Sequence, residues 1–160
     1  MKKYEVRSPG DNISLTIKKL RTSGFLLHKS FYSMILPFLF IAPTSSMGRG
    51  VFTSEEILAG TVIEIAPVIV MSGEERKLLD QTSMHDYIFE WGNESESCCM
   101  ALGYVPVYNH SYKSNCEYEM DFDQHQIAIK TVRSIKAGEE LFINYNGDWD
   151  DSKPLWFDAK

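Results

Sequence analysis

Side chains that could bind or activate a ligand are concentrated between residues 108 and 118. A phenol, an amide, an imidazole and a hydroxyl follow one another from Tyr108 to Ser111, and a second amide and a second phenol follow at Asn115 and Tyr118. Polar groups so concentrated need hydrogen-bond partners, which either a ligand or the turns of the backbone can supply. Taken alone, this segment is therefore compatible with a binding site and equally with an Asx or Ser turn that contains a satisfied histidine.

Two further segments, one on each side of this run, also have residue types that suit a ligand site. Gly48 and Gly50, which flank Arg49, have no Cβ and allow the backbone to turn tightly and to approach a ligand. The segment from Ala137 to Tyr145 leads from a glycine turn into an apolar strand that ends at the tyrosine. Each has a plainer interpretation by itself, the first as a glycine turn between strands and the second as a turn, a core strand and a chain exit.

In this order and spacing, the three segments resemble the SET-domain family of protein lysine methyltransferases. Gly48 to Gly50 is similar to the first cofactor motif of that family, and Glu140 to Tyr145 is similar to its Glu-Leu-x-x-Asp-Tyr motif. Asn109 to Ser111, together with Asn115, is similar to its Asn-His-Ser motif. The resemblance covers about residues 34 to 157, which is nearly all of the chain except its N-terminal leader.

The resemblance implies a mostly β fold, with several small sheets, a C-terminal pseudoknot and few short helices. It also implies S-adenosylmethionine as the cofactor, bound on the face opposite the peptide and joined to it by a narrow channel. The cofactor-binding residues would be Gly48, Arg49, Gly50, Asn109 and His110. Tyr145 would be the catalytic tyrosine. Tyr87 and Tyr118 would line the lysine channel, although both are also compatible with ordinary packing in a sheet.

The chain departs from the family pattern without losing a proposed reacting group. Asn144 stands where the family has an aspartate before the tyrosine, and Tyr112 and Ser114 stand where it has a cysteine and a proline. The zinc-binding cysteine clusters that flank many histone methyltransferases are missing from the sequence, and no metal site is predicted. The aromatic residues of the C-terminal tail are candidates either to close the site or to pack for stability alone; they are Trp149, Trp156 and Phe157.

The elements that must position these residues are predicted to be mainly strands. Segments rich in Ile, Val, Phe and Tyr predict seven of them, at residues 35–42, 51–52, 62–71, 87–91, 115–122, 126–135 and 141–143. Alternation at Ile127, Ile129, Thr131 and Arg133 predicts one buried and one wetter face, and a polar hairpin turn is expected at residues 121–126. One helix is predicted, with a capping box of Ser72 and Glu75 ahead of residues 76–79.

Charge is distributed unevenly along the chain. Residues 1–33 contain seven Lys or Arg and two Asp or Glu, which gives them a net charge of +5. Residues 34–160 contain nine Lys or Arg and twenty Asp or Glu, which gives them a net charge of −11. We expect residues 1–33 to form a flexible basic extension and residues 34–160 to form a single SET domain with a short aromatic tail. A body this acidic repels nucleic acid and attracts basic partners, so the predicted substrate is a lysine-containing protein of histone-like, chromosomal or ribosomal kind. The sequence leaves the oligomeric state open.

Cysteine content and hydropathy favour an intracellular protein. Cys98, Cys99 and Cys116 are odd in number and two are adjacent, which disfavours a disulfide framework. A reducing compartment is therefore expected, the cytoplasm or, in a eukaryote, also the nucleus. The apolar run at residues 34–42 is too short to span a bilayer, and we interpret it as a buried first strand in preference to the core of a signal peptide.

These observations together predict a protein-lysine N-methyltransferase that uses S-adenosylmethionine. The alternative is a non-catalytic SET fold that only binds a peptide or the cofactor, which the presence of Tyr145, Asn109 and His110 disfavours. Hydrolase chemistry through Cys116 and His110 is also disfavoured, because no local nucleophile signature surrounds the cysteine.

Overall fold

Strands make up most of the regular structure, in agreement with the predicted mostly β class. The computed structural model describes residues 33–92 and 96–155. Apart from Ser33, the predicted N-terminal extension at residues 1–33 lies outside this range, as do Trp156 and Phe157 of the tail. Within residues 33–92 and 96–155, no helix is both long enough and apolar enough to cross a membrane.

The described chain contains ten strands, one α-helix and two short 3-10 helices. The strands are β1 (Met34–Ile35), β2 (Leu39–Pro43), β3 (Arg49–Thr53), β4 (Val62–Met71), β5 (Ile88–Trp91), β6 (Ser97–Ala101), β7 (Asn109–His110), β8 (Cys116–Asp121), β9 (Gln126–Thr131) and β10 (Glu140–Ile143). Helix α1 spans Gly73–Leu79, and the 3-10 helices η1 and η2 span Ser83–Tyr87 and Val105–Val107. The predicted capping box is confirmed, because Ser72 and Glu75 exchange side chain-to-backbone hydrogen bonds at the start of α1.

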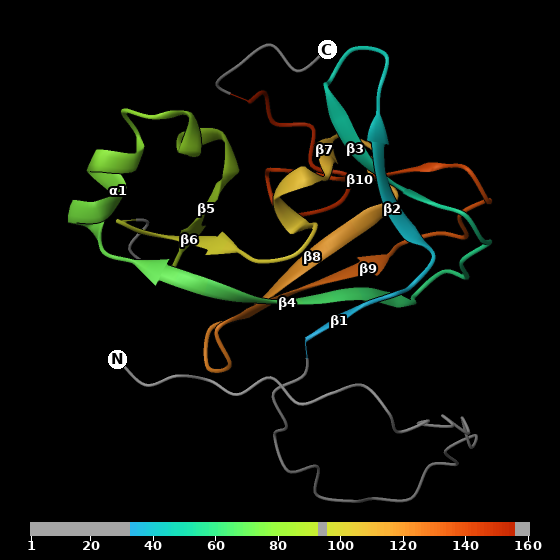
Figure 1. Cartoon of the computed structure of the whole chain (residues 1–160), viewed down its shortest axis with the longest axis horizontal. Coiled ribbons are helices and arrows are strands. Elements are labelled where there is room, and N and C mark those ends of the chain that lie inside the picture. Colours follow the sequence, from blue (N-terminus) through green and yellow to red (C-terminus); the bar gives the residue numbers. More distant parts are fainter. Residues whose placement is uncertain (1–32, 93–95, 156–160) are drawn as a thin grey trace, which may run out of the picture. The chain divides into compact units, whose positions relative to one another are not determined.

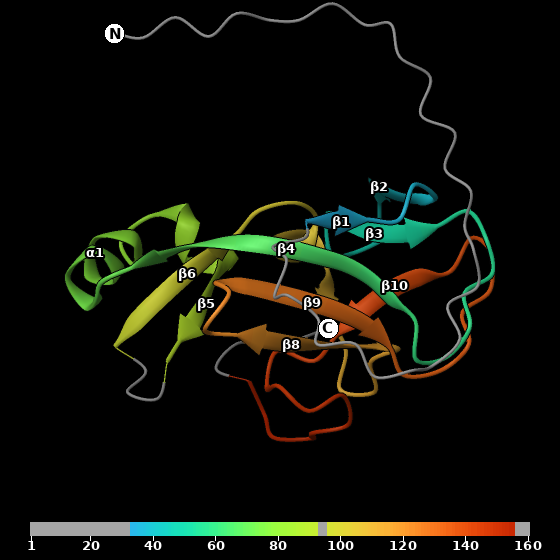
Figure 2. The ribbon, with the colours of Figure 1, turned by 90° about the horizontal axis from the view of Figure 1, so that it is seen from below.

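The strands form two sheets (Figures 1 and 2). One sheet has the order β5-β6-β4-β9-β8, with β1 added beside β4, and the other has the order β2-β3-β10-β7. β4 joins the two ends of the first sheet because its first half pairs with β9 and its second half pairs with β6. The second half of β4 therefore runs beside β6 toward α1, with β5 on the other side of β6 (Figure 1).

The β8–β9 hairpin follows the prediction in part, because β9 ends at Thr131, four residues before the predicted end at residue 135, and Arg133 beyond it is exposed. Ile127, Ile129 and Thr131 are fully buried, whereas Ala128 and Lys130 between them are partly exposed. A turn at residues 122–125 joins the two strands, where a polar hairpin turn is expected. One face of β9 therefore contributes to the core of the domain, as its alternation predicts.

Several elements differ from the prediction, and β7 and the two 3-10 helices are among those that the sequence does not predict. The apolar run at residues 35–42 is interrupted at Pro37, which has no amide hydrogen to donate to a ladder, and its two parts, β1 and β2, join different sheets. The expectation of a buried strand is also wrong, because Ile35, Phe40 and Ile41 are exposed. Strand β6 is not predicted, because its Ser, Cys, Met and Ala residues show neither alternation nor β-branched side chains. It is a strand because β4 and β5 pair with it on its two sides.

The C-terminal part of the chain is interlocked with the segment that follows β7, as expected from a pseudoknot. β10 pairs with β7 in parallel and with β3 in antiparallel orientation. The Ser111 amide donates to the Ile143 carbonyl over 3.0 Å, and the Ser114 amide donates to the Trp149 carbonyl over 3.1 Å. The loop after β7 is thus bound both to β10 and to the chain beyond it, which brings Asn109 and Tyr145 into one region.

Candidate active site

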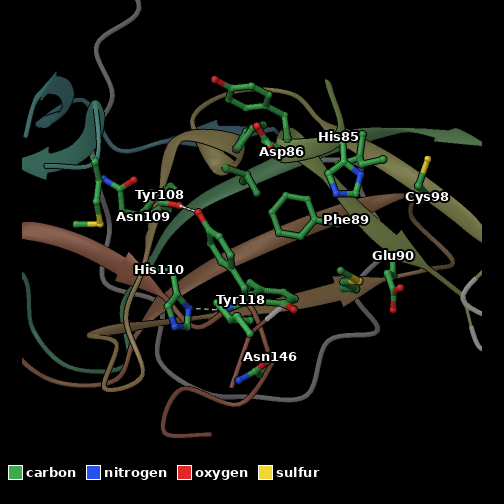
Figure 3. Close-up of a pocket in the computed structure, with 18 of the residues that line it drawn as sticks. His85, Asp86, Phe89, Glu90, Cys98, Tyr108, Asn109, His110, Tyr118 and Asn146 are labelled. Atoms are coloured by element: carbon green, nitrogen blue, oxygen red, sulfur yellow. Dashed lines mark hydrogen bonds between the residues drawn. The ribbon is translucent and has the colours of Figure 1, made fainter. Parts of the chain in front are cut away.

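A cavity of about 940 Å³ gathers most of the predicted site residues (Figure 3). Small-molecule sites commonly occupy about 300–1,000 Å³. In Figure 3, Asn109 and His110 lie toward one end of this cavity, Glu90 and Cys98 lie toward the other, and Phe89 lies between them. Five of the predicted residues line it, namely Tyr87, Tyr118, Tyr145, Asn109 and His110.

Aromatic rings line the middle of the cavity. Phe89 and Tyr118 make an edge-to-face contact with ring centroids 5.7 Å apart. Burial raises the pKa of the Tyr118 hydroxyl, and the nearby Glu90 carboxylate raises it further. Tyr87, at the end of η1, is 40% exposed and stands toward solvent. The middle of the cavity therefore combines apolar ring surface with a phenol that stays neutral.

Tyr145 is held at two points by the chain around β7. Its hydroxyl donates to the Tyr108 carbonyl over 2.9 Å, and its backbone amide donates to Nδ1 of His110 over 3.1 Å. Burial raises the pKa of the Tyr145 hydroxyl to about 12, and the charge of Asp86 acts in the same direction. Because the hydroxyl hydrogen is already donated, the phenolic oxygen can offer only its lone pairs to another group in the cavity.

His110 is a neutral imidazole with one nitrogen unused. Nδ1 accepts the Tyr145 amide, so the ring hydrogen of the neutral form lies on Nε2. Burial lowers the pKa of His110, which keeps the ring uncharged. Nε2 is buried and has no hydrogen-bond partner among the residues that the structure describes. A buried donor without a partner is rare in folded proteins, and it marks a place where a ligand or a water can bind.

Asn109 braces β3 against β10. Its side-chain amide nitrogen donates to the Arg49 carbonyl over 3.1 Å and to the Glu140 carboxylate over 2.7 Å. This arrangement requires glycine at position 50, because a Cβ there would lie 2.9 Å from the Asn109 nitrogen and closer still to the Glu140 carboxylate. Since both amide hydrogens are donated within the protein, the oxygen Oδ1 is the atom that Asn109 can offer to a ligand.

The predicted Gly48–Gly50 segment lies beside the cavity. Gly48 has a φ of 75°, in the left-handed region that favours glycine, and Gly50 pairs with Ala42 within the β2–β3 ladder. Gly48, Arg49 and Gly50 do not line the cavity themselves, whereas the two residues before them, Ser46 and Met47, do.

The cysteines are unsuited to metal binding or nucleophilic chemistry. Cys98, Cys99 and Cys116 are free and buried. Burial raises the pKa of the Cys116 thiol to about 12, which leaves almost no thiolate near neutral pH. In residues 33–92 and 96–155, no group of three or more His, Cys, Asp or Glu side chains is arranged to hold a metal ion.

Comparison with known proteins identifies the family. The SET domain matches residues 48–146, a range that contains all three segments of the site. This chain belongs to the SET-domain family. This chain is 38% identical over 119 residues to the Schizosaccharomyces pombe histone-lysine N-methyltransferase, H3 lysine-37 specific, and the match covers 74% of this chain and 76% of that relative. The domain is therefore that of a protein-lysine methyltransferase.

A solved structure supports the same assignment. A crystal structure of a Plasmodium falciparum protein proposed to be a histone methyltransferase matches this chain with a TM-score of 0.56 and 27% sequence identity. The match covers 72% of this chain and 98% of the Plasmodium chain. The curled sheets and the interlocked C-terminal segment are thus the fold of the SET-domain family.

Residues that depart from the SET pattern make contacts of their own. The buried Asn144 donates to the Asp151 carbonyl over 2.7 Å and accepts from the Asn146 amide over 3.1 Å, whereas an aspartate could only accept. Tyr112 packs edge-to-face on His110, with centroids 4.5 Å apart, and its hydroxyl accepts from the Leu155 amide. Tyr112 thus ties the loop after β7 to the C-terminal segment, whereas Asn144 makes its contacts within that segment.

Asn115 has a structural role in this SET domain. Its side-chain oxygen accepts from the Phe142 amide over 2.7 Å, and its nitrogen donates to the Glu140 carbonyl over 2.8 Å. The amide thereby replaces a neighbouring strand along part of β10. In the tail, Trp149 is 42% exposed and does not line the cavity, whereas Leu155 does.

Sequence reasoning missed the charged end of the cavity. Arg76 contacts Glu90 over 3.1 Å, His85 contacts Asp80 over 3.0 Å, and Asp86 lines the same wall. These residues come from α1 and its C-cap, from η1 and from β5, and they follow no recognisable motif. They meet because α1 packs on both β6 and η1, and the local sequence does not signal that packing.

Proposed function

We propose that this SET domain transfers a methyl group from S-adenosylmethionine to the side-chain amine of a lysine in a basic protein. The observation that carries the proposal is the setting of Tyr145, which lines the cavity with its hydroxyl hydrogen donated to the Tyr108 carbonyl. The lone pairs of its oxygen can then accept a hydrogen bond from a lysine amine. An acceptor held at a fixed place beside aromatic rings meets the main requirement of the reaction, which is alignment.

The chain must deliver the lysine as a neutral amine. When bound, S-adenosylmethionine supplies a methyl carbon on a positive sulfur, so that the amine lone pair forms the N–C bond while the C–S electron pair stays on sulfur. At pH 7, neutralising an unperturbed lysine with a pKa of about 10.4 costs about 4.6 kcal/mol. The rings of Phe89 and Tyr118 exclude water from the amine, which disfavours the ammonium form and lowers its pKa.

Tyr145 orients the amine in this scheme and does not act as a phenolate base. Its pKa of about 12 keeps it protonated near neutral pH, and its hydrogen is held by Tyr108. The proton released by the lysine therefore passes to solvent. Tyr87, which is partly exposed at the end of η1, would line the entrance for the lysine side chain, and Tyr118 would line its inner part.

The cofactor would bind at the Asn109 end of the cavity. Asn109 and His110 suit a polar ligand at this end of the cavity, because His110 Nε2 is a buried donor without a partner in the described chain. Asn109 offers its amide oxygen, since its two hydrogens are donated to Arg49 and Glu140. The backbone at Gly48, Arg49 and Gly50 would shape the wall beside the cofactor.

The substrate would be a basic protein, of histone-like or other chromosomal or ribosomal kind. The net charge of −11 on residues 34–160 favours association with Lys- and Arg-rich chains over nucleic acid. Asp80, Asp86 and Glu90 line the charged end of the same cavity, together with Arg76 and His85. The S. pombe relative, named for lysine 37 of histone H3, supports a histone as the first substrate to test. An intracellular site of action, nuclear or cytoplasmic, accords with the three free cysteines.

The test is methyl transfer to histones by the full chain. Labelled S-adenosylmethionine is incubated with the protein and core histones, and the product is digested and located by mass spectrometry. The matched control is the same histone preparation with its lysines chemically acetylated. We expect label on lysine in the untreated histones only. Cofactor binding without transfer to any lysine-rich protein would favour the alternative, a non-catalytic binding module.

A further inference from the structure

Glu64 is a buried carboxylate in β4 that plays no part in the site described so far. The β4–β9 register shifts between Val62, opposite Lys130, and Glu64, opposite Ile129, so that Ile63 has no counterpart. Such a bulge re-aims side chains, and here both Ile63 and Glu64 are fully buried. Burying a carboxylate is strongly unfavourable unless hydrogen bonds replace its water. The contacts of Glu64 therefore indicate what the bulge achieves.

The three hydrogen bonds to Glu64 come from one segment, residues 104–108. The Tyr104 amide donates over 2.7 Å, the Val105 amide over 3.3 Å and the Tyr108 hydroxyl over 3.1 Å. Burial raises the pKa of Glu64, and these bonds offset part of that effect. Gly103, with a φ of 96°, permits the close approach, because a Cβ there would lie 2.5 Å from a carboxylate oxygen.

This segment leads directly into the active site. The carbonyl of Tyr108 accepts the Tyr145 hydroxyl over 2.9 Å, so the position of Tyr108 determines where the phenol points. Asn109, the next residue, is braced separately by Arg49 and Glu140. A small displacement of Tyr108 would therefore reorient Tyr145 and leave the bracing of Asn109 in place.

We infer that Glu64 is a positioning residue for methyl transfer, because it holds the hydroxyl of Tyr108 and the backbone before it, and so fixes the carbonyl that orients Tyr145. The inference rests on the proposed function. It requires an effect on turnover with little effect on cofactor affinity. It also requires that the effect pass through the Tyr145 hydroxyl.

Two variants of the full chain interrupt this connection. Tyr108→Phe removes only the hydroxyl, and Glu64→Gln keeps the shape of the side chain but not its charge. We expect each to lower kcat about tenfold, since misplacing a reacting group by a fraction of an ångström is costly, and to leave the KM for cofactor within about twofold. The control is Thr131→Val, which removes a buried hydroxyl bonded to the Leu58 carbonyl over 2.8 Å but lies outside the cavity lining. It should lower the melting temperature and leave kcat unchanged.

The decisive comparison is made in the Tyr145→Phe background. If Glu64 acts through the Tyr145 hydroxyl, adding Tyr108→Phe or Glu64→Gln should cause no further loss of single-turnover rate. A further tenfold loss there, or an unchanged kcat in both single variants, would overturn the inference. Tyr108→Phe decides alone if Glu64→Gln does not fold. If the wild-type chain transferred no methyl group, that result would instead contradict the proposed function, and the positioning role of Glu64 would fall with it.

Discussion

Replacing Gly50 with alanine should weaken cofactor binding because it displaces Asn109. The new Cβ would lie 2.9 Å from the Asn109 nitrogen and would overlap the Glu140 carboxylate, which can escape only by rotating away. That movement breaks the 2.7 Å hydrogen bond between Asn109 and Glu140. A hydrogen bond to a charged group contributes about 1.5–3 kcal/mol. If half or more of that loss appears in binding, the Kd for S-adenosylhomocysteine rises between about threefold and a hundredfold.

Isothermal titration calorimetry with S-adenosylhomocysteine measures this effect. The control is Gly60→Ala, because Gly60 has a φ of 76° and a Cβ there would meet nothing within 4 Å, so that this substitution strains the backbone without displacing a side chain. Gly60→Ala introduces backbone strain of about 1–2 kcal/mol and should lower the melting temperature without changing cofactor affinity. A folded Gly50→Ala protein with wild-type affinity would refute the assignment of Asn109 to the cofactor end of the cavity.

Three further predictions concern the lysine channel, acid stability and the N-terminal leader. Tyr118→Phe removes a hydroxyl from the channel and should shift the product toward higher methylation; an unchanged methyl distribution by mass spectrometry would mean that Tyr118 only packs in its sheet. The hydrogen bond from Arg133 holds the pKa of Glu139 at about 2, below the ordinary glutamate value of 4.5. The stabilising contribution of Glu139 is therefore fully present above pH 4.5 and is lost as the pH falls from 4.5 toward 2. Glu139→Gln should therefore flatten the loss of stability over that range in chemical denaturation, and a parallel loss in both proteins would contradict this. A chain that begins at Met34 should keep the melting temperature and cofactor affinity of the full chain, and a large drop in either would show that residues 1–33 pack on the domain.

Local patterns in the sequence were sufficient to predict much of the fold. Hydrophobic alternation predicts β9, and a capping box predicts the start of α1, because both signals lie within a few residues of the structure they specify. β6 carries no such signal and is a strand only through its pairing with β4 and β5. The break at Pro37 could have been predicted, since proline has no hydrogen to give to a ladder.

The site, like the fold, contains some residues whose position could be predicted from the sequence and others whose position could not. The motif residues Asn109, His110 and Tyr145 could be placed in one region because their resemblance to a family supplies the long-range arrangement. The burial of Glu64 could not be predicted from the sequence, because it depends on a bulge in the register of β4 against β9. The charged wall at Asp80 and Glu90 likewise arises from the packing of α1 and η1. Contacts between segments distant in sequence leave no local pattern to recognise.

The central claim is that Tyr145 aligns a lysine amine for methyl transfer, and single-turnover methylation by Tyr145→Phe tests it most directly. Wild type and variant are saturated with S-adenosylmethionine and mixed with the histone substrate, and the methylated product is followed by mass spectrometry. We predict cofactor affinity close to that of the wild type and a rate lower by about a hundredfold, which corresponds to about 2.7 kcal/mol of transition-state stabilisation. Equal rates in the two proteins would contradict the account.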